Sequence, residues 1–221
     1  MSIDWNLVFT GIGETLAMTF FASFFSYLIG LPLGVLLVIT RKGSIRPAPV
    51  FNSILGAVIN FMRSIPFILL IAMLIPVTRI VMGTAIGTAA SVFPLVISAA
   101  PYVARMVESS LMEVDPGVIE ASQSMGSTTW QIIRKVLIPE AIPSLVNGAA
   151  VCITTILAYT AMVSAVGGGG IGSYAITKGY QRGKKYYNFM YVASAALVLL
   201  VQLITIVGTR LSRRLDHRIR K

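Results

Sequence analysis

Long uncharged stretches of this chain alternate with short polar segments, so the hydrophobic pattern repeats on the scale of whole helices. Because a helix rises about 1.5 Å per residue, roughly 20 apolar residues are enough to cross the hydrocarbon core of a bilayer. The pattern predicts an all-α membrane protein with five transmembrane helices in a single domain that covers residues 1–221. These helices are expected at about residues 16–39, 54–78, 84–104, 145–166 and 189–209.

The longest segment without a predicted span, residues 105–144, contains an amphipathic island (Asp115–Pro139). The island starts with an aspartate followed by a proline, which suits the first turn of a short helix. Gly126 fits a helix stop, and Thr128 followed three residues later by Gln131 has the form of a capping box for a second helix that ends at the final proline. The spacing predicts two short helices hinged at Gly126, a shape that can present a surface to a partner.

The composition agrees with a membrane protein, because 56% of the residues are hydrophobic, 12% are charged and the mean hydropathy is +0.82. A soluble domain of this size needs many more charges on its surface. The net charge of +10 could suggest a nucleic-acid partner, but the basic residues flank the apolar stretches in separate clusters, which is typical of membrane anchoring. We therefore expect a lipid bilayer around the chain and no nucleic acid.

The basic residues also orient the predicted spans. Twelve Lys and Arg lie in the turn after the first span, the 105–144 segment and the C-terminal tail from Arg210, against five in the segments on the other side. The positive-inside rule then places the N-terminus outside and these three segments, with the C-terminus, in the cytoplasm. The loop after the fourth span is also basic, and it opposes this orientation without reversing the balance; its cations are Lys178, Arg182, Lys184 and Lys185.

Arg63 and Pro66 interrupt the second predicted span. A charge at this depth costs about 2.5 kcal/mol or more unless it faces protein, water or headgroups. Arg63 therefore either extends to the inner interface or lines an aqueous path. Pro66 removes a backbone hydrogen bond and is expected to bend the helix.

A glycine run, Gly167–Gly170, follows the fourth predicted span and with Gly172 matches G-x-G-x-x-G. The match is weak evidence for nucleotide binding, because no strand precedes it and no βαβ pattern surrounds it. We interpret the run as a flexible exit from the membrane.

The predicted spans lack the residues that most membrane chemistry requires. They contain no histidine, no acidic residue and only one cysteine, Cys152, so we expect no catalytic residue and no metal site. Carriers driven by proton or sodium gradients usually place acidic residues within the membrane. Uphill transport by this chain would therefore need energy from a partner. The 105–144 segment is slightly acidic, which favours a protein over lipid as the partner of the island.

The island resembles the EAA loop of bacterial ABC importer permeases, whose pattern is E-A-A-x3-G-x9-I-x-L-P. The matching residues are Glu120, Ala121, Ser122, Gly126, Val136, Ile138 and Pro139, with three conservative replacements. Further runs resemble the methionine-uptake permeases in particular and extend the likeness over nearly the whole chain; they are Arg63–Phe67, Ala100–Glu108, and Ala161–Met162 before Ala165–Gly167.

The resemblance implies a multi-pass permease of the bacterial plasma membrane that imports D- or L-methionine by alternating access. It implies a homodimer of this chain, two cytoplasmic ABC ATPase subunits and an extracytoplasmic methionine-binding protein. ATP and magnesium would be bound by the ATPase, so the chain itself would carry no cofactor and would not be an enzyme.

The resemblance, together with the position of Arg63 and Pro66 in the second predicted span, suggests two groups of site residues. The residues expected to couple the chain to the ATPase are Ile119, Glu120, Ala121, Met125, Gly126 and Pro139. The residues proposed to line the translocation pathway are Arg63, Pro66, Tyr159, Met162 and Ser164. Each also has a plain structural interpretation, with Glu120 as a solvated residue, Met125 covering membrane-proximal helices and Tyr159 as core packing.

Other functions stay open at this point. The chain could import another amino acid, because related importers share the loop and one methyl-sized change in a pocket discriminates by only about 1 to 3 kcal/mol. It could also be a gradient-driven carrier or a channel that uses the loop for regulation.

Overall fold

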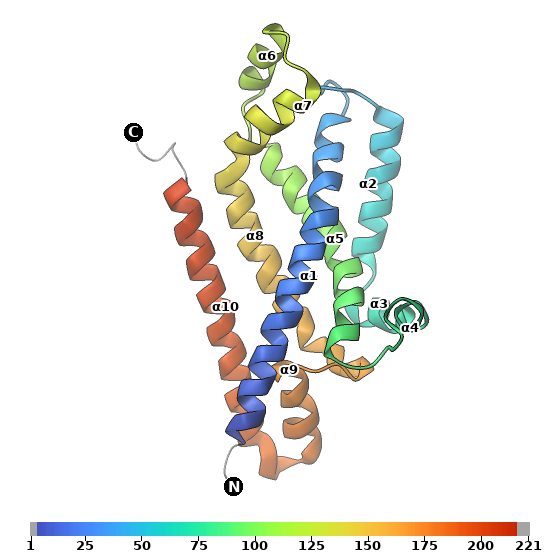
Figure 1. Cartoon of the computed structure of the whole chain (residues 1–221), viewed down its shortest axis with the longest axis vertical. Helices are drawn as coiled ribbons and strands as arrows, with labels where there is room; N and C mark the ends of the chain where they lie inside the picture. The colour runs from blue at the N-terminus through green and yellow to red at the C-terminus, as the bar shows by residue number, and fades with distance from the viewer. Residues whose placement is uncertain (1–3, 216–221) are drawn as a thin grey trace. The chain divides into compact units, whose positions relative to one another are not determined.

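The computed structural model describes residues 4–215, which are helical and contain no strand. The predicted all-α class is therefore confirmed, and Figure 1 follows the helices along the chain from blue to red. The elements are α1 (Trp5–Ile39), α2 (Pro49–Ser64), α3 (Phe67–Met73), α4 (Ile75–Met82), α5 (Thr88–Leu111), α6 (Pro116–Ser124), α7 (Thr129–Ile132), the π-helical turn η1 (Ile133–Leu137), α8 (Ile138–Thr160), the 3₁₀ turn η2 (Met162–Val166), α9 (Ile171–Tyr174), η3 (Ala175–Gly179), η4 (Tyr180–Arg182), η5 (Lys184–Tyr186) and α10 (Tyr187–Leu215). The basic tail predicted from Arg210 continues past residue 215, where Arg218, Arg220 and Lys221 lie outside the described residues.

Within the described range, four helical stretches are long and apolar enough to cross a membrane: Trp5–Ile39, Thr88–Leu111, Thr129–Thr160 and Lys184–Leu215. A fifth candidate results if α2 and α3 count as one bent span. The second predicted span, 54–78, is thus divided among α2, α3 and α4 and is not one helix. Pro66 stands at the break, where it caps α3 with extended backbone (φ −55°, ψ 133°), so the predicted bend at this proline is present.

The second helix of the island does not end at Pro139, contrary to the sequence prediction. α7 continues through η1 into α8, and Pro139 is the second residue of α8. In a regular α-helix the proline ring would clash with the carbonyl four residues earlier. The wider π-helical turn directly before the proline changes that spacing, which explains why the helix continues.

The chain forms two compact units, which we describe separately. Unit 1 consists of the chain up to Ser26, Ile65–Ala99 and Ile153–Thr205. Unit 2 consists of Tyr27–Ser64, Ala100–Cys152 and the chain from Ile206 onward. Each has its own buried apolar clusters.

In unit 2, α1 and α5 approach each other closely along a small-residue seam. Gly30 and Gly34, one helical turn apart, face Val103 and Val107 of α5. A Cβ at Gly30 would lie 2.7 Å from the Val103 side chain, and one at Gly34 would lie 2.6 Å from Val107. Only hydrogen fits at these two positions, as is common where membrane helices pack closely.

In unit 1, the glycine run is fixed against α1. The Glu14 carboxylate accepts the N–H of Gly170 at 2.7 Å, and the Thr15 hydroxyl accepts the N–H of Ile171 at 2.9 Å. Residues 168–170 are buried. Our interpretation of the run as a flexible exit is therefore wrong. Glu14, 156 positions away in the sequence, binds Gly170, and the backbone carbonyls of Ser164 and Val163 accept the N–H groups of Gly167 and Gly168.

Candidate functional site

The first helix of the island, α6, begins as its sequence predicts. The Asp115 carboxylate accepts the N–H of Gly117 at 2.8 Å, which satisfies one of the donors that a helix N-terminus leaves free. Pro116 occupies the first helical position, where its missing N–H costs nothing. The predicted cap of the first helix is confirmed.

Gly126 makes the turn between the two helices. Its φ is +77°, in the left-handed region that residues with a Cβ rarely adopt. The N–H of Met125 donates to Ala121 O at 3.1 Å and the N–H of Ser127 donates to Ser122 O at 3.2 Å, so the last carbonyls of α6 are capped. The predicted glycine hinge is confirmed.

The second helix, α7, starts with the predicted capping box. The N–H of Thr128 donates to Gln131 Oε1 at 2.8 Å, and the N–H of Gln131 donates to Thr128 Oγ1 at 3.4 Å. Two backbone donors are thereby satisfied reciprocally. The shape of the island is therefore fixed by its own local hydrogen bonds.

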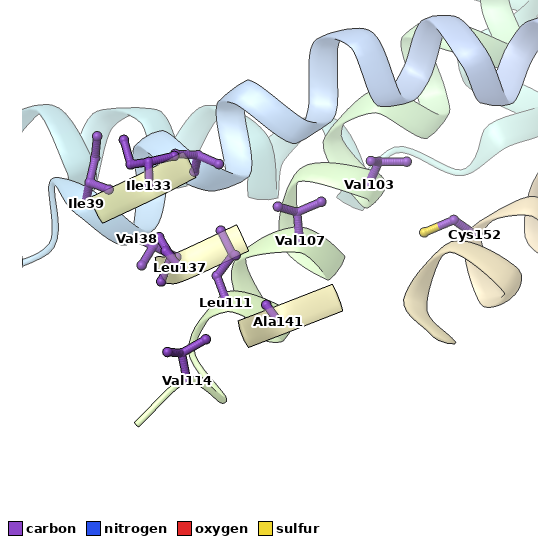
Figure 2. Packing of buried hydrophobic residues seen from close by; sticks show 11 residues of the cluster. Val38, Ile39, Val103, Val107, Leu111, Val114, Ile133, Leu137, Ala141 and Cys152 are labelled. Carbon is purple, nitrogen blue, oxygen red and sulfur yellow. The ribbon is translucent and has the colours of Figure 1, made fainter. Parts of the chain in front are cut away.

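The base of the island is buried in unit 2. We call this set the loop-base cluster; it includes Ile133 and Leu137 of η1, and Figure 2 shows Leu137 beside Leu111 of α5 and Ala141 of α8. Leu137 is fully buried, and Ile119 of α6 packs against the cluster from its edge. The base of the island therefore shares one apolar core with α1, α5 and α8. The full cluster is Val35, Val38, Ile39, Val103, Val107, Leu111, Val114, Ile133, Leu137, Ala141 and Cys152.

The outer surface of the island is exposed and unusually apolar for a solvated loop. Met125 is 85% exposed and Val118 is 42% exposed, while Glu120 and Ala121 are also exposed beside them. A hollow of about 450 Å³ opens between the two short helices. It is lined by Ser122, Met125, Gly126, Ser127, Gln131, Lys135 and Val136.

Trp130 is a surface residue that the sequence pattern missed. Helical spacing with Ile133 and Leu137 favours a shared face for Trp130, but Trp130 is 66% exposed while the other two are buried. Ile132 is buried as well, and a residue two positions earlier points about 200° away from it at 100° per residue. The buried face is therefore set by Ile132 and Ile133, and Trp130 joins the exposed surface.

The proposed coupling residues thus fall into four positions. Glu120, Ala121 and Met125 lie on the outer surface, and Gly126 makes the turn. Ile119 is half-buried against the loop-base cluster. Pro139 is exposed but lies within α8, past the π-helical turn.

Four of the proposed pathway residues belong to unit 1. Pro66 caps α3, whose first residue, Phe67, stacks on the Tyr159 ring with centroids 4.6 Å apart and planes 7° apart. The structure therefore brings Pro66 and Tyr159 to the same place. Met162 is 44% exposed at the start of η2, which packs against α3, and the half-buried Ser164 donates its hydroxyl to Ala161 O at 3.2 Å.

The fifth proposed pathway residue, Arg63, belongs to unit 2. It is exposed at the end of α2, and its guanidinium carbon lies 5.8 Å from the centroid of the Tyr102 ring on α5. This is a cation–π distance. The Tyr102 ring is therefore a partner of the Arg63 charge, and the position of Arg63 in the sequence does not indicate it.

Comparison with known proteins shows what the chain resembles. A family model described as the binding-protein-dependent transport system inner membrane component matches residues 30–221. A Vibrio cholerae protein named probable D-methionine transport system permease protein MetI is 44% identical over 217 residues, which cover 98% of this chain and 96% of the relative. The D-methionine transport system permease protein MetI of Escherichia coli K12 is 51% identical over 158 residues, 72% of each chain.

Solved structures give the same result for the fold. A structure described as inward-facing conformations of the MetNI methionine ABC transporter superposes with a TM-score of 0.94 at 45% identity, covering 98% of this chain and all of that one. A structure of an amino acid ABC transporter with histidines reaches a TM-score of 0.77 at 23% identity and supports the fold alone.

Proposed function

The chain belongs to the family of binding-protein-dependent transport system inner membrane components, and from that premise we propose that it is the permease subunit of an ATP-driven importer of methionine. The observation that carries the proposal is the island: two capped helices around Gly126, with a buried base and an exposed, partly apolar outer surface. Such a surface fits a groove in a partner protein better than it fits water.

Methionine is the proposed substrate because relatives that match over nearly the whole chain are named as D-methionine transport permeases. The membrane-spanning helices form a permease, and ATP hydrolysis belongs to a separate ATPase subunit. In our proposal two copies of the chain form a homodimer, two ATPase subunits bind ATP and magnesium, and an extracytoplasmic binding protein delivers methionine.

The island is the proposed entry point for motion derived from ATP. The residues that would contact the ATPase are Glu120, Ala121 and Met125. Ile119 and Gly126 would hold the shape of that surface, and Pro139 would stand at its far end. When the ATPase subunits close on ATP, they displace the island. Because the loop-base cluster joins the island to α1, α5 and α8 of unit 2, those segments would move with it as one body. Access to the substrate path would then alternate between the two sides.

Uptake into vesicles tests this function directly. The permease, its partner ATPase and the binding protein are reconstituted together, and labelled methionine is followed with ATP inside or outside the vesicle. We expect uptake only when ATP reaches the ATPase side, and we expect ATP hydrolysis to rise when loaded binding protein is added. Unlabelled methionine should compete, whereas amino acids without a thioether should compete poorly.

Two results would contradict the proposal. Uptake driven by a proton or sodium gradient without the ATPase would identify a carrier that uses the island for regulation. Equal competition by other amino acids would keep the importer but remove methionine as its specific substrate.

The pathway proposal makes a separate prediction at Tyr159. The ring stacks on Phe67, and aromatic pairs contribute about 0.5–1.5 kcal/mol beyond their buried area. Aromatic faces also make favourable contacts with thioether sulfur. We expect Tyr159→Phe to keep methionine uptake near the wild-type rate and Tyr159→Ala to reduce it about tenfold, as measured in the same vesicles. Equal loss in both variants would show instead that the hydroxyl group, not the ring, is required.

A further inference from the structure

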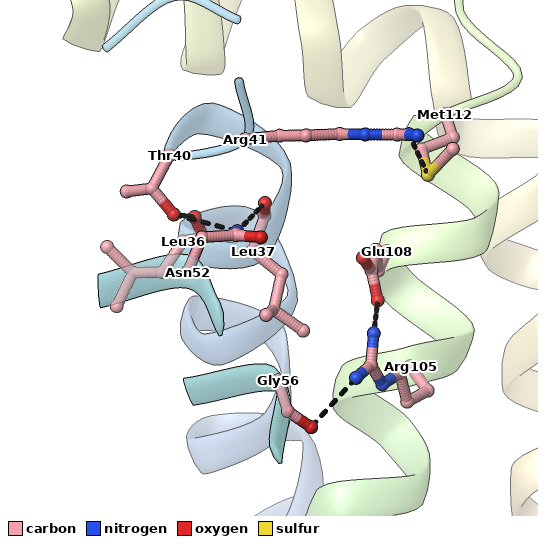
Figure 3. A network of polar contacts seen from close by, with 9 residues as sticks. All are labelled: Leu36, Leu37, Thr40, Arg41, Asn52, Gly56, Arg105, Glu108 and Met112. Atoms are coloured by element: carbon pink, nitrogen blue, oxygen red, sulfur yellow. Dashed lines mark hydrogen bonds and ion pairs between the residues drawn. The ribbon is translucent and has the colours of Figure 1, made fainter. Parts of the chain in front are cut away.

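Arg105 on α5 joins two helices of unit 2. Its Nη1 donates to Glu108 Oε2 at 2.6 Å, and its Nη2 donates to the backbone carbonyl of Gly56 on α2 at 2.9 Å. Figure 3 shows the guanidinium between the carboxylate and the α2 backbone. The Arg105 and Glu108 side chains are 24% and 17% exposed, so the ion pair is largely removed from solvent.

The contact with α2 uses its backbone. A carbonyl oxygen has two lone pairs, so Gly56 O can accept from Arg105 in addition to its bond within the helix. A Cβ at Gly56 would lie 3.2 Å from Arg105 Nη2, and glycine therefore leaves the space that the guanidinium needs. The match between a glycine on one helix and an arginine on the other fixes the register of α2 against α5.

Stability alone is a poor explanation for this arrangement. A largely buried ion pair loses hydration, and apolar residues of the same volume often stabilise a fold as well or better. Arg105 Nε is buried and has no hydrogen-bond partner among the described residues, which adds to the desolvation cost. The pair instead fixes geometry, because the planar guanidinium holds the Glu108 carboxylate and the Gly56 carbonyl at the same time.

Helix α2 is also held at both of its ends. At the start of α2, Asn52 Nδ2 donates to Leu37 O at 2.6 Å and to Thr40 Oγ1 at 3.0 Å. At its end, the Arg63 guanidinium lies over the Tyr102 ring. Arg105 supplies the contact between these two points, so α2 is tied to α1 and α5 along its length; Figure 3 shows the contacts of Asn52 and Arg105.

Arg105 also lies close to the island along the chain. α5 ends at Leu111, and α6 is capped by Asp115 four residues later. A helix does not stretch under load, because each turn is closed by its hydrogen bonds. Displacement of the island therefore reaches Arg105 through one turn and a half of α5, and the guanidinium passes it on to the α2 backbone.

We propose that Arg105 is a positioning residue of transport: with Glu108 and the Gly56 carbonyl it transmits displacement of the island from α5 to α2. This rests on the proposed function, since it specifies how the island acts. Loss of the Arg105 contact leaves the ATPase docked and active, but less of the displacement reaches the middle of α2, which is then held by Asn52, by Arg63 and by the packing of Ile59. ATP is then hydrolysed with little methionine imported.

The decisive variant removes the ion pair without leaving a buried charge. Arg105→Met combined with Glu108→Leu replaces both groups by apolar side chains of similar length. The measurement is the number of ATP molecules hydrolysed per methionine imported, in vesicles that contain the complete transporter. We expect co-purification of the ATPase and the melting temperature to stay near wild type, and ATP per methionine to rise about fivefold or more, the lower end of typical coupling between sites.

Two further variants separate positioning from charge. Arg105→Lys keeps the charge, but an ammonium group cannot hold the carboxylate and the carbonyl in the fixed geometry of a guanidinium. We therefore expect this variant also to show a raised ratio of ATP to methionine. Gly56→Ala keeps both charged groups but places a Cβ 3.2 Å from Nη2, so the guanidinium must shift slightly and we expect a smaller rise in the same ratio. Ser53→Ala, at an exposed position on the same helix, is the matched control for helix propensity and should behave as wild type.

A double variant with the wild-type ratio of ATP to methionine overturns the proposal, as does full rescue by Arg105→Lys. If the double variant fails to assemble, Arg105→Lys decides instead, and a wild-type ratio there overturns the proposal. Absence of ATP-driven uptake in the wild-type vesicles would count against the proposed function and not against the role of Arg105, which is measured only relative to wild type.

Discussion

Replacement of Gly126 by valine is expected to abolish co-purification of the partner ATPase while the permease still inserts into the membrane. The φ of Gly126 is +77°, and the left-handed region costs an L-residue about 1–2 kcal/mol, more for a β-branched side chain. A Cβ at this position would meet nothing within 4 Å, so the substitution introduces backbone strain without a clash. The turn between α6 and α7 would reorganise, and Met125 and Trp130 would no longer lie on one surface.

The matched control for this prediction is Gly126→Asn. Asparagine enters the left-handed region more readily than other residues with a Cβ, so it should keep the turn and most of the complex. Both variants should reach the membrane in equal amounts, because the loop-base cluster does not include residue 126. Co-purification of the ATPase at wild-type yield with Gly126→Val would show that the shape of the turn does not matter for docking.

The shape of the island could be predicted from sequence because its determinants are local. The Asp115 cap, the turn at Gly126 and the capping box at Thr128 each involve residues no more than five apart. Local hydrogen bonds of this kind leave a signature in residue type and spacing. The position of Trp130 could not be predicted in this way, because tertiary burial of Ile132 and Ile133 decides which face turns inward.

The continuation of the helix through Pro139 has no comparable signal. Proline usually ends or kinks a helix, and residue propensities do not foretell a π-helical turn that accommodates it. The turn is instead part of the packing of Ile133 and Leu137 into the loop-base cluster. Its presence makes the island continuous with α8, which a break at Pro139 would have prevented.

Long-range contacts account for the other differences from the sequence prediction. The sequence pattern favours a flexible glycine run, yet Glu14 and Thr15 of α1 accept the N–H groups of Gly170 and Ile171. Arg105 binds the α2 backbone 49 residues away, a contact that its position in the sequence does not indicate. Spacing along the chain carries no information about such partners.

Gly172→Ala is expected to destabilise unit 1 and to eliminate uptake, the largest effect we predict outside the island. Gly172 is buried in α9, and a Cβ there would lie 2.5 Å from Ala161 Cβ and 2.7 Å from Ala161 Cα. A backbone atom cannot rotate away as a flexible side chain can, so α9 or the end of α8 must shift. Overpacking of this kind costs about 1–3 kcal/mol and sometimes more, which lowers the melting temperature by several degrees.

The functional consequence follows from the neighbour of Ala161. Met162, one of the proposed pathway residues, is the next residue and begins η2, so a shift at Ala161 displaces it together with the segment that packs against α3. Gly13→Ala is the matched control: a Cβ at that exposed helical position of α1 would meet nothing within 4 Å, and the change should stabilise the helix by roughly 0.5–1 kcal/mol. Thermal unfolding in detergent and methionine uptake in vesicles measure both variants. Equal melting temperatures and equal uptake would mean that α9 can move away from Ala161 freely, and that the close approach of α9 to the end of α8 does not hold the pathway segment in place.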